Sequence, residues 1–324
     1  MPISSVATSV EKRHQKAGSV SKVSTLWLEE VSPDLKESSI IKYEDILRSY
    51  ILPIFGDKEL SDITNENLLC FVKDLRTTGG IRRNGLAPST VSEVVTTLNA
   101  LRVYALRRDQ TILFDPECVC IKKDKQNIRV FSIPEENLLI SYLKENLTPI
   151  HLGILICLYT GIRIGELCAL KWNMIDLSEK TMCIGCTMQR IRVSGKEHKT
   201  EVKIIEPKST HSRRTIPLPD VLVPLLGKYY TPGAFLLSGN SEKYVEPRCL
   251  QKRFKTILKK CGIEPANFHA TRHTFATRCV ELGFDIKSLS EILGHSGVTI
   301  TMNKYVHPTM DLKKTNMNRL PEQF

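Results

Sequence analysis

Apolar residues in the first third of the chain recur at the three- and four-residue spacing of amphipathic helices, beginning near Ser24. The pattern predicts four helices in this part of the chain. Pro53 and Gly56 are expected to end the second helix. Ser89 is expected to cap the fourth, because a hydroxyl accepts a hydrogen bond from a free N–H group at a helix start. Four consecutive amphipathic helices predict a small helical bundle.

The periodicity divides the chain into four parts. Residues 1–22 lack it and are expected to form a flexible tail, residues 23–110 form the helical bundle, and residues 111–130 are expected to be a linker. Residues 131–324 begin with helices, pass through β-branched runs between positions 181 and 217, and return to helices. The predicted fold class is therefore mainly α with a small antiparallel β-sheet (α+β).

The composition is that of a folded protein. Hydrophobic residues occupy 41% and charged residues 25% of the 324 positions, as in soluble globular chains. The longest apolar stretch, residues 150–159, is short of the ~20 residues that a membrane span needs, and the N-terminus has no apolar core of a secretory signal. No membrane partner is expected, and the expected location is the cytoplasm, in association with the nucleoid.

The net charge of +11 indicates a polyanionic partner, either nucleic acid or an anionic membrane surface. Residues 131–324 hold 27 Lys and Arg against 18 Asp and Glu, whereas residues 1–130 hold 19 against 17, so the excess lies mainly in the second domain. A surface of solvated lysines is the alternative interpretation. The charge favours nucleic-acid binding without establishing it.

The ten cysteines do not form a pattern typical of a metal site. Cys183 and Cys186 have the C-x-x-C spacing, but no second pair follows at the distance of a zinc ribbon. The other cysteines lie mostly within apolar patterns, as reduced and buried thiols do. No metal is expected.

Two charged clusters carry candidate chemistry. Arg163 and Glu166 lie three residues apart after a glycine turn, a spacing that an ordinary surface ion pair also has. His269, Arg272 and His273 share one helical face, where their like charges favour an anion such as phosphate. A zinc site is disfavoured on this face because the glutamate that would follow the first histidine is absent.

Two further candidates lie nearer the C-terminus. His295 directly follows Gly294, which is expected to end a helix capped by Asp285, and Tyr305 lies ten residues later. A histidine at a helix end is often a cap, and a tyrosine in a terminal helix is often half-buried packing. Neither residue indicates a function alone.

Taken in their order, these residues resemble the tyrosine recombinase (phage integrase) family. The matching stretches are residues 160–170, 207–217, 269–277 and 293–305. Residues 87–90 and the helix after them also resemble the family's core-binding domain. The resemblance implies a SAM-like, DNA-binding core-binding domain at residues 23–110 and a catalytic domain with a C-terminal tail at residues 131–324.

The resemblance implies a site-specific DNA recombinase, an integrase that cuts and rejoins DNA through a 3′-phosphotyrosyl intermediate. Tyr305 would attack the scissile phosphate, and Arg163 and Arg272 would bind its non-bridging oxygens. His269 would take the tyrosine proton, and His295 would donate to the phosphoryl group.

Two more roles follow from the resemblance. Lys208 would be the general acid for the leaving 5′-oxygen, with Lys203 and Lys199 as alternatives in the same β region. Glu166 would support the arginines. No metal, ATP or other cofactor is implied, because the phosphotyrosine keeps the bond energy for resealing and the sequence has no Gly-x-x-x-x-Gly-Lys-Ser/Thr loop.

The resemblance also implies the partners. The two domains would clamp double-stranded DNA attachment sites, and a homotetramer would assemble on two sites, with residues 310–324 docking on a neighbouring subunit or, alternatively, on their own. A directionality factor or a host DNA-bending protein would assist. The candidate DNA contacts are Arg82, Arg83, Lys122, Lys123 and Lys125.

Integration or excision of a phage or transposon is the leading hypothesis, and three alternatives stand beside it. A Xer-like recombinase would resolve chromosomes or plasmids, a type IB topoisomerase would relax DNA with the same residue set, and a DNA-binding regulator would have lost catalysis. The helical bundle and the tail favour recombination, and the presence of all six candidate catalytic residues disfavours the regulator.

Overall fold

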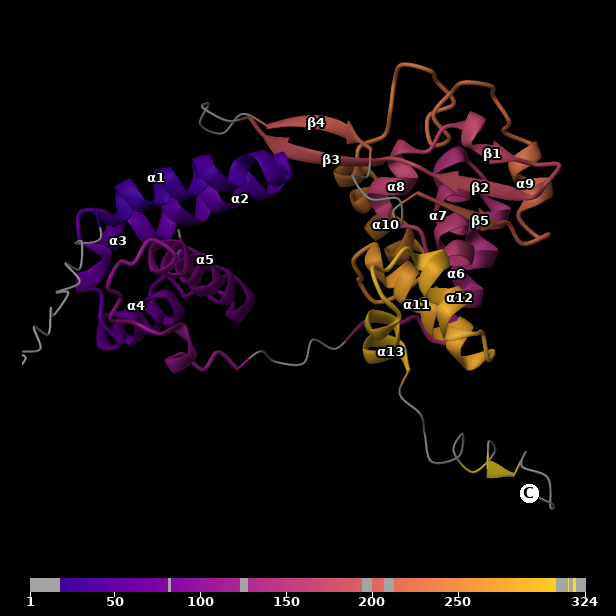
Figure 1. Ribbon diagram of the computed structural model, residues 1–324. Coiled ribbons are helices and arrows are strands. Elements are labelled where there is room, and N and C mark those ends of the chain that lie inside the picture. The colour runs from indigo at the N-terminus through magenta and orange to yellow at the C-terminus, as the bar shows by residue number, and fades with distance from the viewer. Residues whose placement is uncertain are drawn as a thin grey trace, which may run out of the picture. The chain divides into compact units, whose positions relative to one another are not determined.

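The chain forms two compact units that divide at residue 126. The computed structural model describes residues 18–80, 83–122, 128–193, 200–206 and 213–306, with Lys314, Met317 and Asn318. Figure 1 shows helices α1 to α5 in the first unit and the remaining helices and all strands in the second.

The N-terminal unit is a bundle of helices around one apolar core. Its helices are α1 (Val20–Val31), α2 (Glu37–Ile46), α3 (Leu52–Phe55), α4 (Asn65–Thr77) and α5 (Pro88–Leu106). Two of them begin at a side-chain cap: Ser19 accepts from the N–H of Lys22 in α1, and Thr64 accepts from the N–H of Asn67 in α4. The helical bundle that the hydrophobic pattern predicts is therefore present.

Two helix boundaries differ from the prediction. Pro53 does not end the second helix, because a π-helical turn (Leu47–Ile51) joins α2 to α3 and the helical chain continues past Pro53 to Phe55. Ser89 lies inside α5 instead of capping it. The cap residue is Ala87, without a side-chain hydrogen bond, and Pro88 starts the helix with its fixed φ angle.

The N-terminal unit extends beyond residues 23–110 at both ends. Val20 is fully buried in its core, Phe114 is buried in the same core, and Ile121 packs against it. The segment that was expected to be a linker therefore belongs to this unit up to Ile121, and the helical part begins before the predicted end of the tail. Residues 1–17 and 123–127 lie outside the described residues.

The C-terminal unit is built around α7 (Pro149–Thr160), of which nine of 12 residues are buried. A helix that is apolar on all sides is stable only inside a core. The other helices are α6 (Ile133–Glu145), α8 (Ile164–Ala169), α9 (Val223–Gly227), α10 (Pro247–Lys260), α11 (His269–Glu281), α12 (Ile286–Leu293) and α13 (Val298–Tyr305). Figure 1 shows α11, α12 and α13 grouped together, and α11 packs against α7, α12 and α13.

Two small antiparallel sheets complete the C-terminal unit. One has the order β1 (Ile175–Asp176), β2 (Thr181–Ile184), β5 (Arg214–Pro217), and the other is a hairpin of β3 (Thr187–Arg192) and β4 (Thr200–Ile205). The hairpin packs against α8, and a Cβ atom on Gly165 would lie 2.7 Å from the backbone oxygen of Met188, so only glycine allows this approach. These elements confirm the predicted fold class.

No three His, Cys, Asp or Glu side chains of the described residues are placed to hold a metal ion. Cys183 is exposed and Cys186 is half-buried, and both are free thiols. In the part of the chain that the structure describes, no helix has both the length and the apolar character that a membrane crossing requires.

Candidate active site

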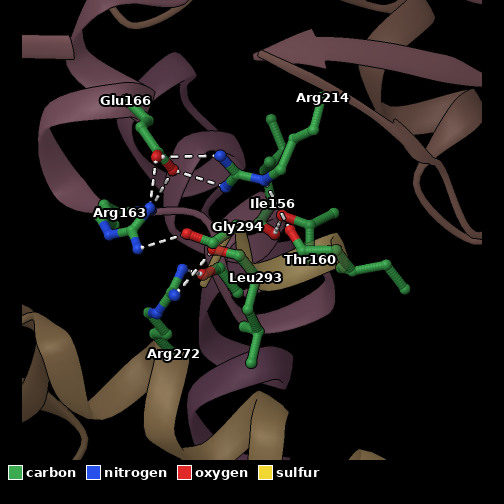
Figure 2. A network of polar contacts seen from close by, with 10 residues as sticks. Ile156, Thr160, Arg163, Glu166, Arg214, Arg272, Leu293 and Gly294 are labelled. Carbon is green, nitrogen blue, oxygen red and sulfur yellow. Dashed lines mark hydrogen bonds and ion pairs between the residues drawn. The ribbon is translucent and has the colours of Figure 1, made fainter. Parts of the chain in front are cut away.

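The C-terminal end of α12 organises the candidate site. A helix end leaves its last carbonyl groups without N–H partners, and the helix dipole makes this end negative. Here the successive carbonyl oxygens of Ile292, Leu293 and Gly294 each accept a hydrogen bond from a different arginine. Figure 2 shows the three arginines gathered around Leu293 and Gly294. The helix end therefore sets the positions of three cationic side chains.

Arg272, on α11, is the most deeply buried of these arginines, with 2% of its surface exposed. Its Nη1 donates to the carbonyl oxygen of Gly161 at 2.8 Å, and its Nη2 donates to that of Leu293 at 2.8 Å. Burial and the neighbouring Arg163 lower the pKa of Arg272 to about 10. Arg272 is therefore still charged at neutral pH, and it keeps three N–H groups for other acceptors.

Arg163 precedes α8 and pairs with Glu166. Nη1 of Arg163 donates to Oε1 of Glu166 at 2.8 Å, Nη2 donates to the carbonyl oxygen of Gly294 at 3.0 Å, and the backbone N–H donates to Oε2 of Glu166 at 2.9 Å. Glu166 is buried. The ion pair that the spacing also allowed is therefore present, but its carboxylate is buried and does not lie at the surface.

Arg214, on β5, is the third arginine of the cluster. Its Nε donates to the carbonyl oxygen of Ile292 at 2.7 Å, and its Nη1 and Nη2 donate to the two carboxylate oxygens of Glu166 at 3.1 and 2.8 Å. The side chains of Arg214 and Glu166 are both buried. This fork-shaped contact holds β5, α8 and the end of α12 together.

Glu166 is the carboxylate that the three arginines surround. Burial raises the pKa of Glu166, but the hydrogen bonds and charge of Arg214, together with Arg163, outweigh burial and hold the pKa at about 2. The carboxylate is therefore ionised at neutral pH. One negative charge among three guanidinium groups leaves an excess of positive charge, which favours a bound anion.

Tyr305 is the last residue of α13 and is buried beside this cluster. Its hydroxyl lies 2.9 Å from Nδ1 of His273 on α11. Burial raises the pKa of Tyr305, and the nearby Arg272 and Arg163 act in the opposite direction. The hydroxyl is therefore protonated at rest, and any anion formed on it would lie near two guanidinium groups.

The histidines of the site surround the tyrosine. The ring of His295 is parallel to that of Tyr305, with centroids 6.3 Å apart, and its Nδ1 lies 2.7 Å from Oγ1 of Thr301. The ring of His269 meets that of His273 edge to face, 4.9 Å away.

All three histidines are held neutral. Burial, followed by nearby cations that include Arg272 and Lys304, lowers the pKa of His269, His273 and His295 to about 4 each. At neutral pH the imidazoles are therefore free bases that can accept a proton.

Most of the predicted site residues come together. Around the end of α12 and α13 lie Arg163, Glu166, His269, Arg272, His295 and Tyr305. Lys208 and its alternative Lys199 lie outside the described residues. Lys203 lies on β4, with its Nζ atom 3.0 Å from Oε1 of Glu201. The identity of the general acid therefore stays a prediction.

The candidate DNA contacts lie in and beside the N-terminal unit. Arg83 and Lys122 are exposed, and the backbone of Arg83 has a positive φ angle of 51°. Arg82, Lys123 and Lys125 lie outside the described residues.

Sequence reasoning missed three contributions to the site. Arg214 lies in a strand that the sequence predicted, but no local pattern connects it with Glu166. His273 was placed on the correct helical face, but His269 was expected beside the tyrosine proton. Lys304 was not among the predicted site residues, although its Nζ lies 5.7 Å from the ring centroid of Tyr305.

A basic stripe on α10 was also missed. Exposed side chains recur at one-turn and two-turn spacing along this helix, so they share a face. The stripe consists of Arg248, Lys252, Lys255 and Lys259. Its spacing is visible in the sequence and would have revealed it.

Comparison with known proteins agrees with this geometry. The phage integrase family matches residues 131–311, and the phage integrase N-terminal SAM-like domain matches residues 19–76. The chain belongs to the phage integrase family. Membership in the phage integrase family makes the chain an enzyme of the tyrosine site-specific recombinase class and confirms the resemblance that the motifs indicated.

Phage integrase relatives match over most of the chain. The tyrosine recombinase XerC-like protein of Caldanaerobacter subterraneus subsp. tengcongensis is 30% identical, over 90% of this chain and 79% of the relative. The ICEBs1 integrase of Bacillus subtilis is 22% identical, over 96% of this chain and 86% of the relative. The solved structure of the Tn1549 transposon integrase with a circular intermediate DNA has the same fold, with a TM-score of 0.74 at 22% identity, over 92% of this chain and 99% of that one.

Proposed function

We propose that this tyrosine recombinase is the integrase of a bacterial mobile element, a phage or a transposon, and that it integrates or excises the element at double-stranded DNA attachment sites. The similarity to the ICEBs1 integrase and to the Tn1549 transposon integrase supports this role. Resolution of chromosomes or plasmids is a second candidate, because the relative with 30% identity is XerC-like.

The proposed chemical step is attack by Tyr305 on a scissile phosphate. The Oη atom forms a bond to phosphorus, the bond to the 5′-oxygen breaks, and the 5′-hydroxyl leaves with a proton, so a 3′-phosphotyrosyl bond holds one DNA end. The reverse attack by a 5′-hydroxyl reseals DNA without ATP or metal. The observation that carries this proposal is the buried Tyr305 hydroxyl beside the arginines Arg163 and Arg272.

The roles of the surrounding residues follow from their contacts. Arg163 and Arg272 each spend two N–H groups on protein acceptors and keep three for the non-bridging phosphate oxygens. His295, whose ring is parallel to that of Tyr305, donates a hydrogen bond from its remaining ring N–H to the phosphoryl group. His269 lies one turn from Arg272, with its ring against that of His273. Glu166 keeps Arg163 in place.

Lys208 is proposed as the general acid for the leaving 5′-oxygen, with Lys199 and Lys203 as the alternatives. The leaving alkoxide needs one proton for each cleavage. The ammonium group of a lysine can supply this proton, whereas the guanidinium group of an arginine keeps its protons.

DNA binding is proposed to involve both units. The exposed stripe Arg248, Lys252, Lys255 and Lys259 on α10 supports phosphate contacts, and Arg83 and Lys122 are candidates in and beside the N-terminal unit, together with Arg82, Lys123 and Lys125. A homotetramer on two DNA sites is proposed from the likeness in fold to the lambda integrase, which was solved as a tetramer bound to a Holliday junction. The TM-score is 0.63 at 15% identity, over 92% of this chain and 81% of that one.

The test of the proposed function is a cleavage assay on nicked DNA. The substrates carry the ends of the element that encodes the chain, and a denaturing gel separates covalent protein–DNA complexes. The wild-type protein is expected to form such a complex. Tyr305→Phe is expected to form none while binding the same DNA with unchanged affinity, because only the reacting oxygen is removed.

Each alternative has its own outcome in this assay or in assays of plasmid relaxation and strand exchange. A covalent complex that persists in Tyr305→Phe contradicts the assignment of the nucleophile. Relaxation of a supercoiled plasmid that lacks the site, without strand exchange, favours a topoisomerase. Binding without cleavage by the wild-type protein favours a regulator, and strand exchange only at a chromosomal or plasmid resolution site favours the Xer-like role.

A further inference from the structure

His273 is the histidine that touches the nucleophile. Its Nδ1 lies 2.9 Å from the Tyr305 hydroxyl. The ring of His295 lies parallel to the ring of Tyr305, but its Nδ1 faces Oγ1 of Thr301, and the ring of His269 contacts that of His273. Helix α11 packs against α13, so the contact joins two packed helices and is not an accident of one flexible side chain. A proton on Oη of Tyr305 has Nδ1 of His273 in hydrogen-bonding distance.

The surroundings of His273 keep its ring neutral at rest. Burial lowers the pKa of His273 to about 4, with further contributions from Lys304 on α13 and from His269 and Arg272 on α11. A neutral imidazole with its proton on Nε2 presents a lone pair at Nδ1, and this lone pair accepts the hydrogen bond of the phenol.

We propose that His273 is a catalytic residue of this recombinase, the base that accepts the proton of Tyr305 as the tyrosine attacks DNA. The inference rests on the proposed function of Tyr305 as the nucleophile. It gives the proton-accepting role to the second histidine of the His-x-x-Arg-His sequence and leaves His269 one ring further from the hydroxyl.

The proton balance of the step is complete. Oη transfers its proton to Nδ1 as the Oη–phosphorus bond forms, and the phosphorus–5′-oxygen bond breaks with its electron pair on the 5′-oxygen, which takes a proton from the separate general acid. In the resealing direction the 5′-hydroxyl attacks phosphorus, and His273 returns its proton to the departing tyrosine oxygen. No oxidant or further reactant is needed.

Bound DNA makes this transfer favourable. Without DNA, the nearby cations oppose a further positive charge on His273, so the tyrosine stays protonated and inactive. A phosphate anion among Arg163 and Arg272 neutralises part of this field and stabilises the imidazolium that the transfer creates. The base is therefore active chiefly when the substrate is in place.

The experiment measures the rate of covalent complex formation on the nicked substrate for the wild type, His273→Gln and His269→Gln. Glutamine keeps the size and a hydrogen-bonding group of histidine but accepts no proton at neutral pH. We expect His273→Gln to cleave about 100-fold more slowly, within the range of general base catalysis, with the wild-type melting temperature and DNA affinity. Cleavage by His273→Gln at the wild-type rate overturns the proposal.

A second measurement separates a base from a packing residue. Tyr305 is replaced by fluorinated tyrosine, whose more acidic phenol loses its proton without help. We expect this replacement to raise the rate of His273→Gln at least about tenfold and to leave His269→Gln unrescued. No rescue, or equal rescue in both variants, overturns the assignment.

A substrate with sulfur in place of the 5′-oxygen gives an independent control, because a thiolate leaves without a proton. Loss of the general acid is rescued by this substrate, whereas the defect of His273→Gln is expected to persist. Rescue of His273→Gln would assign it to the acid instead and overturn the proposal. A wild-type protein that forms no Tyr305-linked complex overturns the proposed function itself, so the two failures are distinct.

Discussion

Glu166 shows how one buried charge is made tolerable by its neighbours. Its carboxylate accepts hydrogen bonds from Arg163 and from both Nη atoms of Arg214, and the cost of removing it from water is offset by these contacts. Removing one member of such a group leaves the others buried and unpaired. The stability of the cluster therefore depends on the ionised state of Glu166.

Glu166→Gln is expected to lower the free energy of unfolding by about 3 kcal/mol at pH 7. The folded pKa of about 2 lies below the ordinary value of 4.5, so the stabilisation is present above pH 4.5 and is lost as the pH falls toward 2. Urea unfolding of the wild type and of Glu166→Gln between pH 7 and pH 3 measures the free energy of unfolding of each protein. The difference between wild type and variant should shrink below pH 4.5, and a difference independent of pH would contradict the assigned pKa.

At the scale of elements, the end of α12 explains the Leu-Gly-His sequence. Gly294 ends the helix with a φ angle of 64°, in the left-handed region that favours glycine. A Cβ atom there would lie 2.8 Å from Nη1 of Arg214, whose guanidinium is held by Glu166 and by the carbonyl of Ile292. The glycine is therefore needed both for the helix end and for the approach of the arginine.

Gly294→Ala is expected to displace Arg214 and to slow covalent complex formation at least about tenfold, because a small misplacement of catalytic groups is costly. Gly283→Ala is the matched control. Gly283 has a φ angle of 77°, and no atom lies within 4 Å of an added Cβ. An alanine at this position therefore causes backbone strain without a steric clash. Both variants should lose stability, and equal cleavage rates in the two would contradict a specific role of the Gly294 contact.

At the scale of the whole molecule, part of the excess positive charge lies in the exposed stripe on α10. The side chains of Lys252 and Lys255 are exposed one turn apart on a helix whose other face is buried through Phe254 and Leu258. Cationic side chains arranged in this way bind the phosphates of a polyanion and release the counterions that surround them. DNA affinity should therefore depend on this stripe and on the salt concentration together.

The double variant Lys252→Ala, Lys255→Ala is expected to bind attachment-site DNA and unrelated DNA more weakly by similar factors. The slope of log K against log salt should decrease by about 2, since each phosphate contact contributes about 0.9. Fluorescence anisotropy at several salt concentrations measures this. Lys228→Ala, an exposed lysine beyond α9, is the control, and an equal change of slope in this variant would show a non-specific charge effect.

The sequence alone determined the class of fold and six residues that the structure brings together in the candidate site: Arg163, Glu166, His269, Arg272, His295 and Tyr305. Helical periodicity predicted the bundle, and the order of Arg163, the His-x-x-Arg motif, Leu-Gly-His and Tyr305 predicted a tyrosine recombinase, which the family match confirmed. Such signals are local, because the residues that form a helix face or a motif lie close together in the sequence. Ser89 and Pro53 were misjudged because propensity alone does not decide which of two neighbouring residues begins or ends a helix.

Only the tertiary structure decided which of these residues meet. The contact of His273, and not His269, with the Tyr305 hydroxyl depends on how α11 packs against α13. Arg214 and Glu166 are in contact although 48 positions separate them in the sequence. The arginines donate to backbone carbonyl groups, and the residue types that supply these groups do not indicate the contact. Backbone acceptors and long-range pairs leave no pattern in a single sequence, because any residue supplies a carbonyl and packing alone chooses the partner.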